Sequence, residues 1–110
     1  MESRTHTENG YTVLELEGEV DLSCSPEARR EILDVLKAGQ HLLVDLSSVS
    51  YIDSSGVASL VEGYQVAKKK KLKFGLVGVS QSALGVLVLA RLDKVFPIHA
   101  SVAERIRSDG

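Results

Sequence analysis

A short apolar run at residues 42–46, followed closely by a segment with helical periodicity, limits the fold of this chain more than any other feature. The run contains only leucine and valine apart from Asp45, as is typical of a buried strand. Beyond residue 56, apolar side chains recur every three or four positions, which places one apolar stripe along a helix. The stripe comprises Val57, Ala58, Leu60, Val61, Tyr64 and Ala67. The sequence therefore predicts a strand, a short loop and a helix.

The loop between them ends in Asp53, Ser54, Ser55 and Gly56. Aspartate and serine are favoured helix N-caps, so Ser55 is expected at or inside the first helical turn. A helix N-terminus carries free amide hydrogens and a partial positive charge, which tolerate an anion. A phosphate on Ser55 would add about 1.5 to 2 negative charges at neutral pH without melting the helix. It would therefore change the surface that a partner meets.

Strands and helices alternate along the rest of the chain with short connections. We expect strands at 11–17, 19–22, 42–46, 72–77 and 95–98, and helices that begin near residues 25, 54, 82 and 101. Pro97 removes one backbone donor, which argues that the last strand lies at a sheet edge. This order predicts an α/β fold with a mostly parallel sheet of four to five strands and about four helices.

The length of 110 residues is that of one domain. We assign this domain to residues 11–107. Residues 1–10 are polar, and we expect them to form a flexible tail. The single cysteine, Cys24, fits a reducing compartment, and the apolar runs are too short to cross a bilayer. We therefore expect a cytoplasmic protein that does not insert into a membrane.

The charges argue against nucleic acid as a partner. Fifteen acidic and thirteen basic residues give a net charge of −2. The lysine run at 68–71 falls at the end of a predicted helix, where cations complement the helix dipole, and no aromatic residues are interleaved to stack bases. We interpret this run as solvated surface.

The chain lacks the motifs of the common enzyme classes. It contains no phosphate-binding glycine loop, no dinucleotide fingerprint and no nucleophile elbow. His6, His41 and His99 are scattered, and with one cysteine they give no metal-ligand spacing. We expect no cofactor, no metal and no enzymatic activity.

The stretch from Val44 to Gly56, VDLSSVSYIDSSG, resembles the signature of the STAS domain family, named for sulphate transporters and anti-sigma-factor antagonists. Two further stretches are similar to the family in the expected order: Gly18 to Asp21 resembles the turn after its first strand, and Leu92 to Ile98 resembles its last loop and strand. The resemblance covers about residues 11 to 106. One departure is Val57-Ala58, where many antagonists have Leu-Gly.

The resemblance implies a mechanism of partner switching. In the antagonist branch the second serine of the Asp-Ser-Ser-Gly tetrad is phosphorylated, which is Ser55 here, with Ser54 as the fallback. The unmodified protein would bind an anti-sigma factor that is also a serine kinase, and phosphorylation would release it. A metal-dependent serine phosphatase would restore binding. The implied partner-binding residues are Asp53, Ser54, Ser55 and Gly56, joined by Glu19 and Asp21.

The third predicted helix is more apolar than the fold requires. If Leu84, Val88 and Leu92 face the core, Val86 and Leu89 point outward, and exposed apolar patches often mark contact surfaces. We expect Val86 and Leu89 to meet a partner or a second copy of the chain.

Two other functions stay open. A STAS subunit of a transporter or lipid-transport complex would use the apolar helix for assembly. A small nucleotide-binding or hydrolytic α/β protein would need the glycine loop that is missing.

Overall fold

The computed structural model describes residues 1–109 as one five-stranded sheet with four helices. The strands are β1 (Glu2–Glu8), β2 (Tyr11–Val20), β3 (His41–Ile52), β4 (Phe74–Val77) and β5 (Ile98–His99). The helices are α1 (Ser25–Lys37), α2 (Ser54–Lys70), α3 (Gln81–Leu89) and α4 (Val102–Asp109). The strands lie in the order in which they occur in the chain; β1 is antiparallel to β2 and all other pairs are parallel. The predicted α/β fold is confirmed, and β5 forms the sheet edge as Pro97 indicated.

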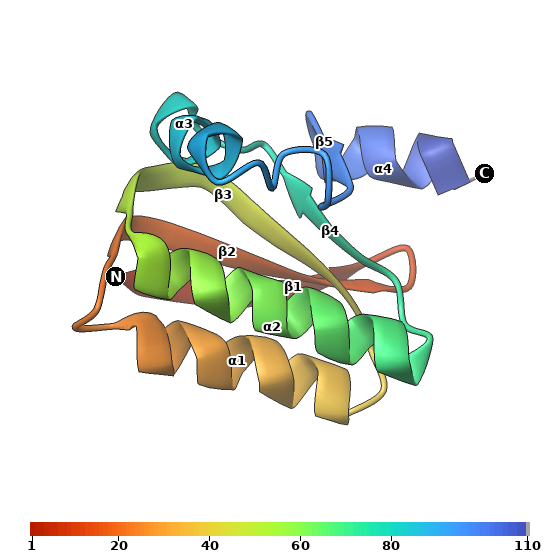
Figure 1. Cartoon of the computed structure of the whole chain (residues 1–110). Coiled ribbons are helices and arrows are strands. Elements are labelled where there is room, and N and C mark those ends of the chain that lie inside the picture. Colours follow the sequence, from red (N-terminus) through yellow and green to blue (C-terminus); the bar gives the residue numbers. More distant parts are fainter. Residues whose placement is uncertain (110) are drawn as a thin grey trace.

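The sheet separates two apolar layers. Helices α1 and α2 lie side by side along one face (Figure 1), and the main core there includes Leu14, Leu36, Val44 and Leu60, all almost fully buried. On the other face, α4 covers a smaller cluster of four buried residues. These residues are Tyr11, Val13, Leu43 and Val77. Successive residues of a strand point to opposite faces, so β2 and β3 supply both layers.

The first ten residues are not the flexible tail that we expected. Residues 2–8 form β1, which pairs antiparallel with β2 from Glu2 opposite Glu17 to Glu8 opposite Tyr11. Asn9 and Gly10 connect the two strands with φ angles of 48° and 87°, the positive values that a tight hairpin turn needs. All seven side chains of β1 are polar, which the strand tolerates because it lies at the sheet edge, where backbone pairing does not require an apolar face.

The central strands are longer than predicted. The expected break at Gly18 is a bulge within β2, with register shifts on both sides and a φ of 91° at the glycine. Strand β3 continues to Ile52, so Asp45 lies inside the strand and not at its end. With β2 ending at Val20 and β3 at Ile52, only Asp53 separates the sheet from the start of α2, which fixes where that helix begins.

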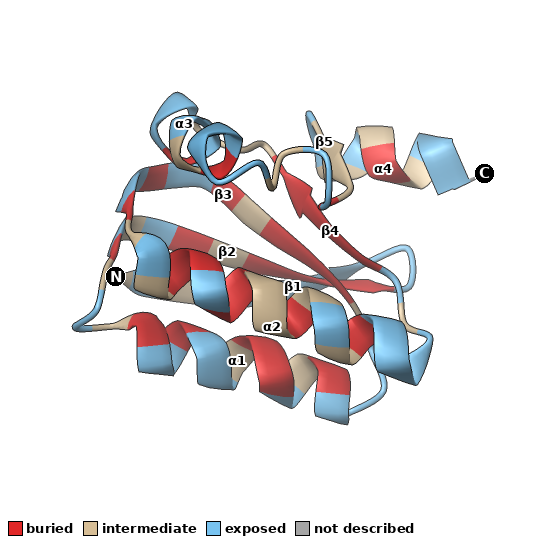
Figure 2. Cartoon of the chain, viewed as in Figure 1, coloured by how far each residue is buried: buried red, intermediate tan, exposed pale blue. Residues whose placement is uncertain are grey.

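Helix α3 confirms the predicted outward face only in part: Leu89 is exposed and Leu92 is partly buried against the core, as expected, but Leu84 and Val88 are exposed and Val86 is half-buried. Its buried residues are Ala83 and Leu87, Val86 is half-buried against the core, and most of the helix is exposed (Figure 2). The outward residues are Leu84, Val88 and Leu89, whose exposed fractions are 38%, 49% and 87%. An almost uniformly apolar helix has no periodicity that selects a face. Ser80 fixes the start of the helix on the sheet, because it caps the helix and donates a 2.7 Å hydrogen bond to the carbonyl of Val49.

Candidate functional site

Asp53 is the N-cap of α2 and organises its first turn. Its Oδ1 accepts hydrogen bonds from the backbone amides of Ser55 (3.0 Å) and Gly56 (3.1 Å), and from the hydroxyl of Ser55 (2.6 Å). The other oxygen, Oδ2, accepts from the amide of Leu22 at 3.1 Å. One carboxylate therefore caps the helix and also ties it to the loop between β2 and α1.

These donors stabilise the charged form of the carboxyl group. The Ser55 hydroxyl, followed by the Gly56 amide, lowers the pKa of Asp53 below its usual 3.8, against a smaller opposing effect of desolvation. Asp53 is therefore ionised at neutral pH.

The two serines differ in accessibility and bonding. Ser54 is exposed, whereas Ser55 is half-buried and directs its hydroxyl hydrogen at Asp53. We expected free helix amides to receive a phosphate on Ser55, but Asp53 already occupies the Ser55 and Gly56 amides. These two amides are therefore not free to bind a phosphate on Ser55.

Gly56 lies where α2 begins against the end of β2. A Cβ atom at this position would come within 2.7 Å of both the Val20 carbonyl oxygen and Cγ1 of Ile52. The Val20 carbonyl also accepts the Asp53 amide at 3.2 Å, so it cannot retreat freely. The glycine thus permits the close approach that places the tetrad at the sheet end.

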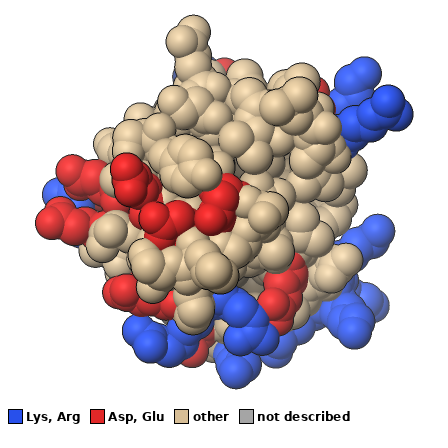
Figure 3. Space-filling view, turned by 60° about the vertical axis from the view of Figure 1, so that its left-hand side comes forward, with Lys and Arg blue, Asp and Glu red and all other residues tan. Residues whose placement is uncertain are grey.

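The structure brings Glu19 and Asp21 to the same end of the molecule as the tetrad. Glu19 is exposed and pairs in the sheet register with Tyr51, two residues before Asp53. Asp21 accepts from the Ser23 amide and hydroxyl, which lower its pKa, while the nearby charge of Asp53 opposes this shift. Figure 3 views the end where α2 begins and shows carboxylates gathered beside a wide uncharged area. All six predicted partner-binding residues therefore share one region.

Two apolar side chains at this end were not predicted. Leu22 follows Asp21 and is 74% exposed, and Tyr51 at the end of β3 is 50% exposed. Large apolar side chains at this level of exposure are typical of protein contact surfaces. Sequence periodicity could not identify them because both lie where regular structure ends.

A shallow groove of about 260 Å³ runs between α1 and α2, and Ser55 lines it. Arg29 of α1 and Glu62 of α2 bridge the groove with two contacts, 2.6 Å from Nε to Oε1 and 2.7 Å from Nη2 to Oε2. Each partner shifts the other's pKa, raising that of Arg29 and lowering that of Glu62. No sequence pattern indicated this pair, whose members are 33 residues apart.

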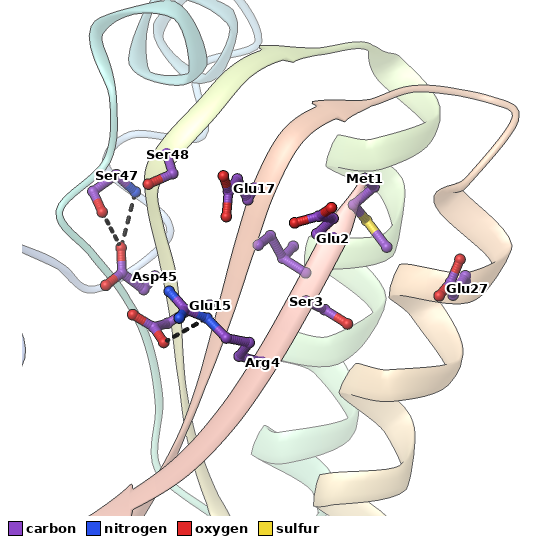
Figure 4. A pocket seen from close by; sticks show the side chains of 11 residues that line it. Met1, Glu2, Ser3, Arg4, Glu15, Glu17, Glu27, Asp45, Ser47 and Ser48 are labelled. Atoms are coloured by element: carbon purple, nitrogen blue, oxygen red, sulfur yellow. Dashed lines mark hydrogen bonds and ion pairs between the residues drawn. The ribbon is translucent and has the colours of Figure 1, made fainter.

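A larger depression, of about 470 Å³, lies over β1, β2 and β3 (Figure 4). Some of its polar groups are paired: Arg4 contacts Glu15 at 3.8 Å, and Asp45 accepts from the Ser47 amide and hydroxyl at 2.9 and 2.7 Å. Within residues 1–109 no group of three histidine, cysteine or carboxylate side chains could hold a metal ion. We assign no chemistry to this depression.

None of the four helices described is both long and apolar enough to cross a membrane.

Curated relatives of the chain carry regulatory names. The chain is 26% identical over 83 residues to the anti-sigma-B factor antagonist of Bacillus subtilis, covering 76% of each protein. It is 24% identical over 92 residues to the anti-sigma F factor antagonist of Paenibacillus polymyxa, covering 82% of this chain and 79% of that protein.

Solved structures share the fold. An anti-sigma factor antagonist from Mycobacterium paratuberculosis aligns with a TM-score of 0.85 at 25% identity, over 97% of this chain and 92% of that one. Phosphorylated SpoIIAA from Bacillus aligns with a TM-score of 0.75 at 19% identity, over 99% and 100%. A sulfate transporter family protein from Wolinella succinogenes aligns with a TM-score of 0.74 at 18% identity, over 90% and 84%.

The family model of the STAS domain matches residues 2–105, nearly the whole chain and including β1. With the five-stranded sheet, the four helices and the tetrad at the start of α2, this match places the protein: the chain belongs to the STAS domain family.

Proposed function

We propose that this protein is an anti-sigma-factor antagonist that binds its anti-sigma factor when Ser55 is unmodified and releases it when Ser55 is phosphorylated. The observation that carries the proposal is the Ser55 hydroxyl, which lies in the first turn of α2 and is held by Asp53 at 2.6 Å. The names of the curated relatives support the general role. SpoIIAA, which shares the fold, has been solved in both phosphorylated and unphosphorylated forms.

The proposed binding surface combines apolar and acidic groups. Leu22 and Tyr51 supply exposed apolar area, and Glu19, Asp21 and Asp53 supply negative charge around the tetrad. A partner suited to this surface has an apolar patch bordered by basic side chains. The role requires the compartment that contains sigma factors, which is the cytoplasm.

The proposed switch is a phosphoryl transfer from ATP to Ser55 by the anti-sigma factor acting as a kinase. The Ser55 oxygen forms a bond to the γ-phosphorus, the bond between that phosphorus and the bridging oxygen breaks, ADP leaves, and the hydroxyl proton is released. Asp53 orients the hydroxyl through their hydrogen bond. A serine phosphatase reverses the change by hydrolysis of the phosphate ester.

Phosphorylation would add about 1.5 to 2 negative charges beside the existing carboxylates. It would also remove the hydrogen that Ser55 now donates to Asp53. A partner that fits the unmodified hydroxyl would meet a dianion of larger volume. A loss of about 2.7 kcal/mol in binding free energy is sufficient to weaken the complex roughly a hundredfold.

Capture from the native cytosol tests this function. Immobilised wild-type protein, Ser55→Ala and Ser55→Glu would be compared, with Ser54→Ala as the matched control, and captured proteins would be identified by mass spectrometry. We expect wild type, Ser55→Ala and Ser54→Ala to retain an anti-sigma kinase, and Ser55→Glu to bind the purified kinase at least tenfold more weakly, equivalent to about 1.4 kcal/mol. Phosphorylation of Ser54→Ala but not Ser55→Ala by that kinase would assign the modified residue; the reverse pattern would assign Ser54 and contradict the proposal.

A second candidate function is assembly into a transporter complex. The outward face of α3 favours it, because Leu84, Val88 and Leu89 remain exposed in the isolated chain. The fold shared with the Wolinella protein is compatible with this role. Co-purification of transporter subunits without a kinase would support the second function over the first.

A further inference from the structure

The groove between α1 and α2 is the space next to Ser55 that a phosphate on this residue can occupy. Both helices begin at the same end of the molecule and lie side by side (Figure 1). Ser59 fixes their register, because its hydroxyl contacts the carbonyl of Ser25 at 3.3 Å. Ser55 lies one turn before Ser59 on α2, and Arg29 lies one turn beyond Ser25 on α1. All four residues line the groove.

Asp53 prevents the phosphate from staying where the hydroxyl now points. Its Oδ1 is 2.6 Å from the Ser55 oxygen and also holds the Ser55 and Gly56 amides. After phosphorylation the ester oxygen has no hydrogen to donate, and the carboxylate and the phosphate repel each other. The side chain of phosphorylated Ser55 therefore favours a rotamer directed away from Asp53.

Arg29 is the cation available on the groove side. Among the described residues that line the groove it alone carries a positive charge. Its side chain is 52% exposed, and that of Glu62 is 38% exposed, so water screens their bidentate ion pair and the guanidinium is accessible to a competing anion. In the unmodified protein the guanidinium contacts Glu62, about two turns beyond Ser55 along α2, so it must turn toward the start of α1, the direction in which long helix side chains lean, to meet the phosphate. A phosphate dianion accepts two parallel guanidinium hydrogen bonds and carries more charge than a carboxylate.

We propose that Arg29 is the intramolecular receptor of phosphorylated Ser55. On phosphorylation its guanidinium leaves Glu62 and pairs with the phosphate. This inference rests on the proposed phosphorylation of Ser55. It extends the switch from the tetrad to α1, because the exchange leaves Glu62 unpaired and places the guanidinium and the phosphate between the two helices. In the unmodified protein Glu62 neutralises Arg29.

The test uses protein in which phosphoserine is incorporated at position 55 during translation. A phosphorus NMR titration measures the second pKa of the phosphate, which is about 6 for an unpaired phosphoserine. A paired guanidinium favours the dianion and lowers this pKa. We expect Arg29→Gln to raise the pKa of the phosphate by about 0.5 or more relative to the protein with Arg29. Arg30→Gln, which removes the exposed neighbouring arginine outside the groove, is the matched control and should change it much less.

A second variant tests the exchange itself. Glu62→Gln removes the carboxylate that competes for Arg29, so it should lower the pKa of the phosphate below that in the protein with Glu62. If the phosphate binds at a different place, the substitution should leave this pKa unchanged. Equal effects of Arg29→Gln and Arg30→Gln, or no effect of either, would overturn the inference. Backbone amide spectra confirm that each variant is folded.

The result does not depend on a kinase, because translation supplies the phosphate. If the pKa of the phosphate depends on Arg29 but no anti-sigma factor is captured from cytosol, the proposed function is rejected. The inference that Arg29 binds the phosphate still holds in that case. Weakened kinase binding by Ser55→Glu with no role for Arg29 would reject the receptor alone.

Discussion

Helices α2 and α3 both follow parallel strands, yet they are anchored differently. In α2 a carboxylate accepts four hydrogen bonds, and the glycine at position 56 has no free space around it. In α3 the Ser80 hydroxyl accepts one amide hydrogen, from Ala83, and a Cβ atom added at Gly85 would meet no neighbouring atom within 4 Å. The start of α2 is held from several sides, whereas α3 is held by the Ser80 cap with its bond to Val49, by two buried side chains and by the half-buried Val86.

This difference separates two kinds of surface. The start of α2 presents one hydroxyl in a fixed geometry, which is what recognition by an enzyme and a binding partner requires. Helix α3 presents apolar area without a fixed polar group, since Leu89 is 87% exposed. In the function proposed above, phosphorylation changes the first surface, while the second contributes only contact area.

The largest expected effect is a change in the free energy of unfolding, and it differs in sign between substitutions at Gly56 and at Gly85. Gly56→Ala places a methyl group 2.7 Å from the Val20 carbonyl oxygen and from Ile52, and we expect a loss of about 2–3 kcal/mol in the free energy of unfolding. Gly85→Ala meets no neighbour and raises helix propensity, so it should add about 0.5–1 kcal/mol. Urea denaturation measures both. Similar values for the two variants would show that the start of α2 is not tightly packed.

A smaller effect is expected from removing the caps. Asp53→Ala deletes the acceptor of four hydrogen bonds and should lower the thermal midpoint by about 4–8 °C. Ser80→Ala deletes one helix cap and one bond to Val49, and should lower it by less. Calorimetry gives both midpoints. A larger loss for Ser80→Ala would reverse the comparison.

The two caps should also differ in their response to pH. The pKa of Asp53 is lowered in the folded protein, so its stabilising effect is complete above its usual value of 3.8 and is lost as the pH falls through the lower folded value. The amide resonances of Ser55 and Gly56 should follow this titration. The Ala83 amide, which Ser80 caps with a hydroxyl that does not titrate, should not. Asp53→Asn is the control in which the Ser55 and Gly56 amides lose the transition.

The smallest effect on stability is expected at the outer face of α3. Leu89→Glu changes a side chain that is 87% exposed, and the free energy of unfolding should stay within about 0.5 kcal/mol of wild type. If α3 is a contact surface, the same substitution weakens self-association or partner capture, measured by analytical ultracentrifugation and pull-down. Unchanged association in both assays would exclude this face of α3 as a contact surface.

Much of the architecture could be predicted because apolar patterns report burial. The strand before Asp53 and the helix after it followed from such patterns, and the structure has both. Strand β1 could not be found in this way, since its polar side chains do not distinguish a paired edge strand from a tail. The outward face of α3 could not be chosen either, because a helix that is apolar all round offers no contrast between its faces.

Within the candidate site, the local sequence determined the cap. An aspartate can reach the amides two and three residues after it whatever surrounds the helix, so the local sequence offered Asp53 as the cap, with Ser54 as the alternative. Ser55 was singled out as the modified residue by the resemblance to the STAS family. Tertiary structure decided the rest. It brings the Leu22 amide to Asp53, 31 residues away, and Arg29 to Glu62, 33 residues away. It also leaves the side chains of Leu22 and Tyr51 exposed. These contacts depend on how the helices and strand ends pack, and packing joins residues whose separation along the chain carries no signal.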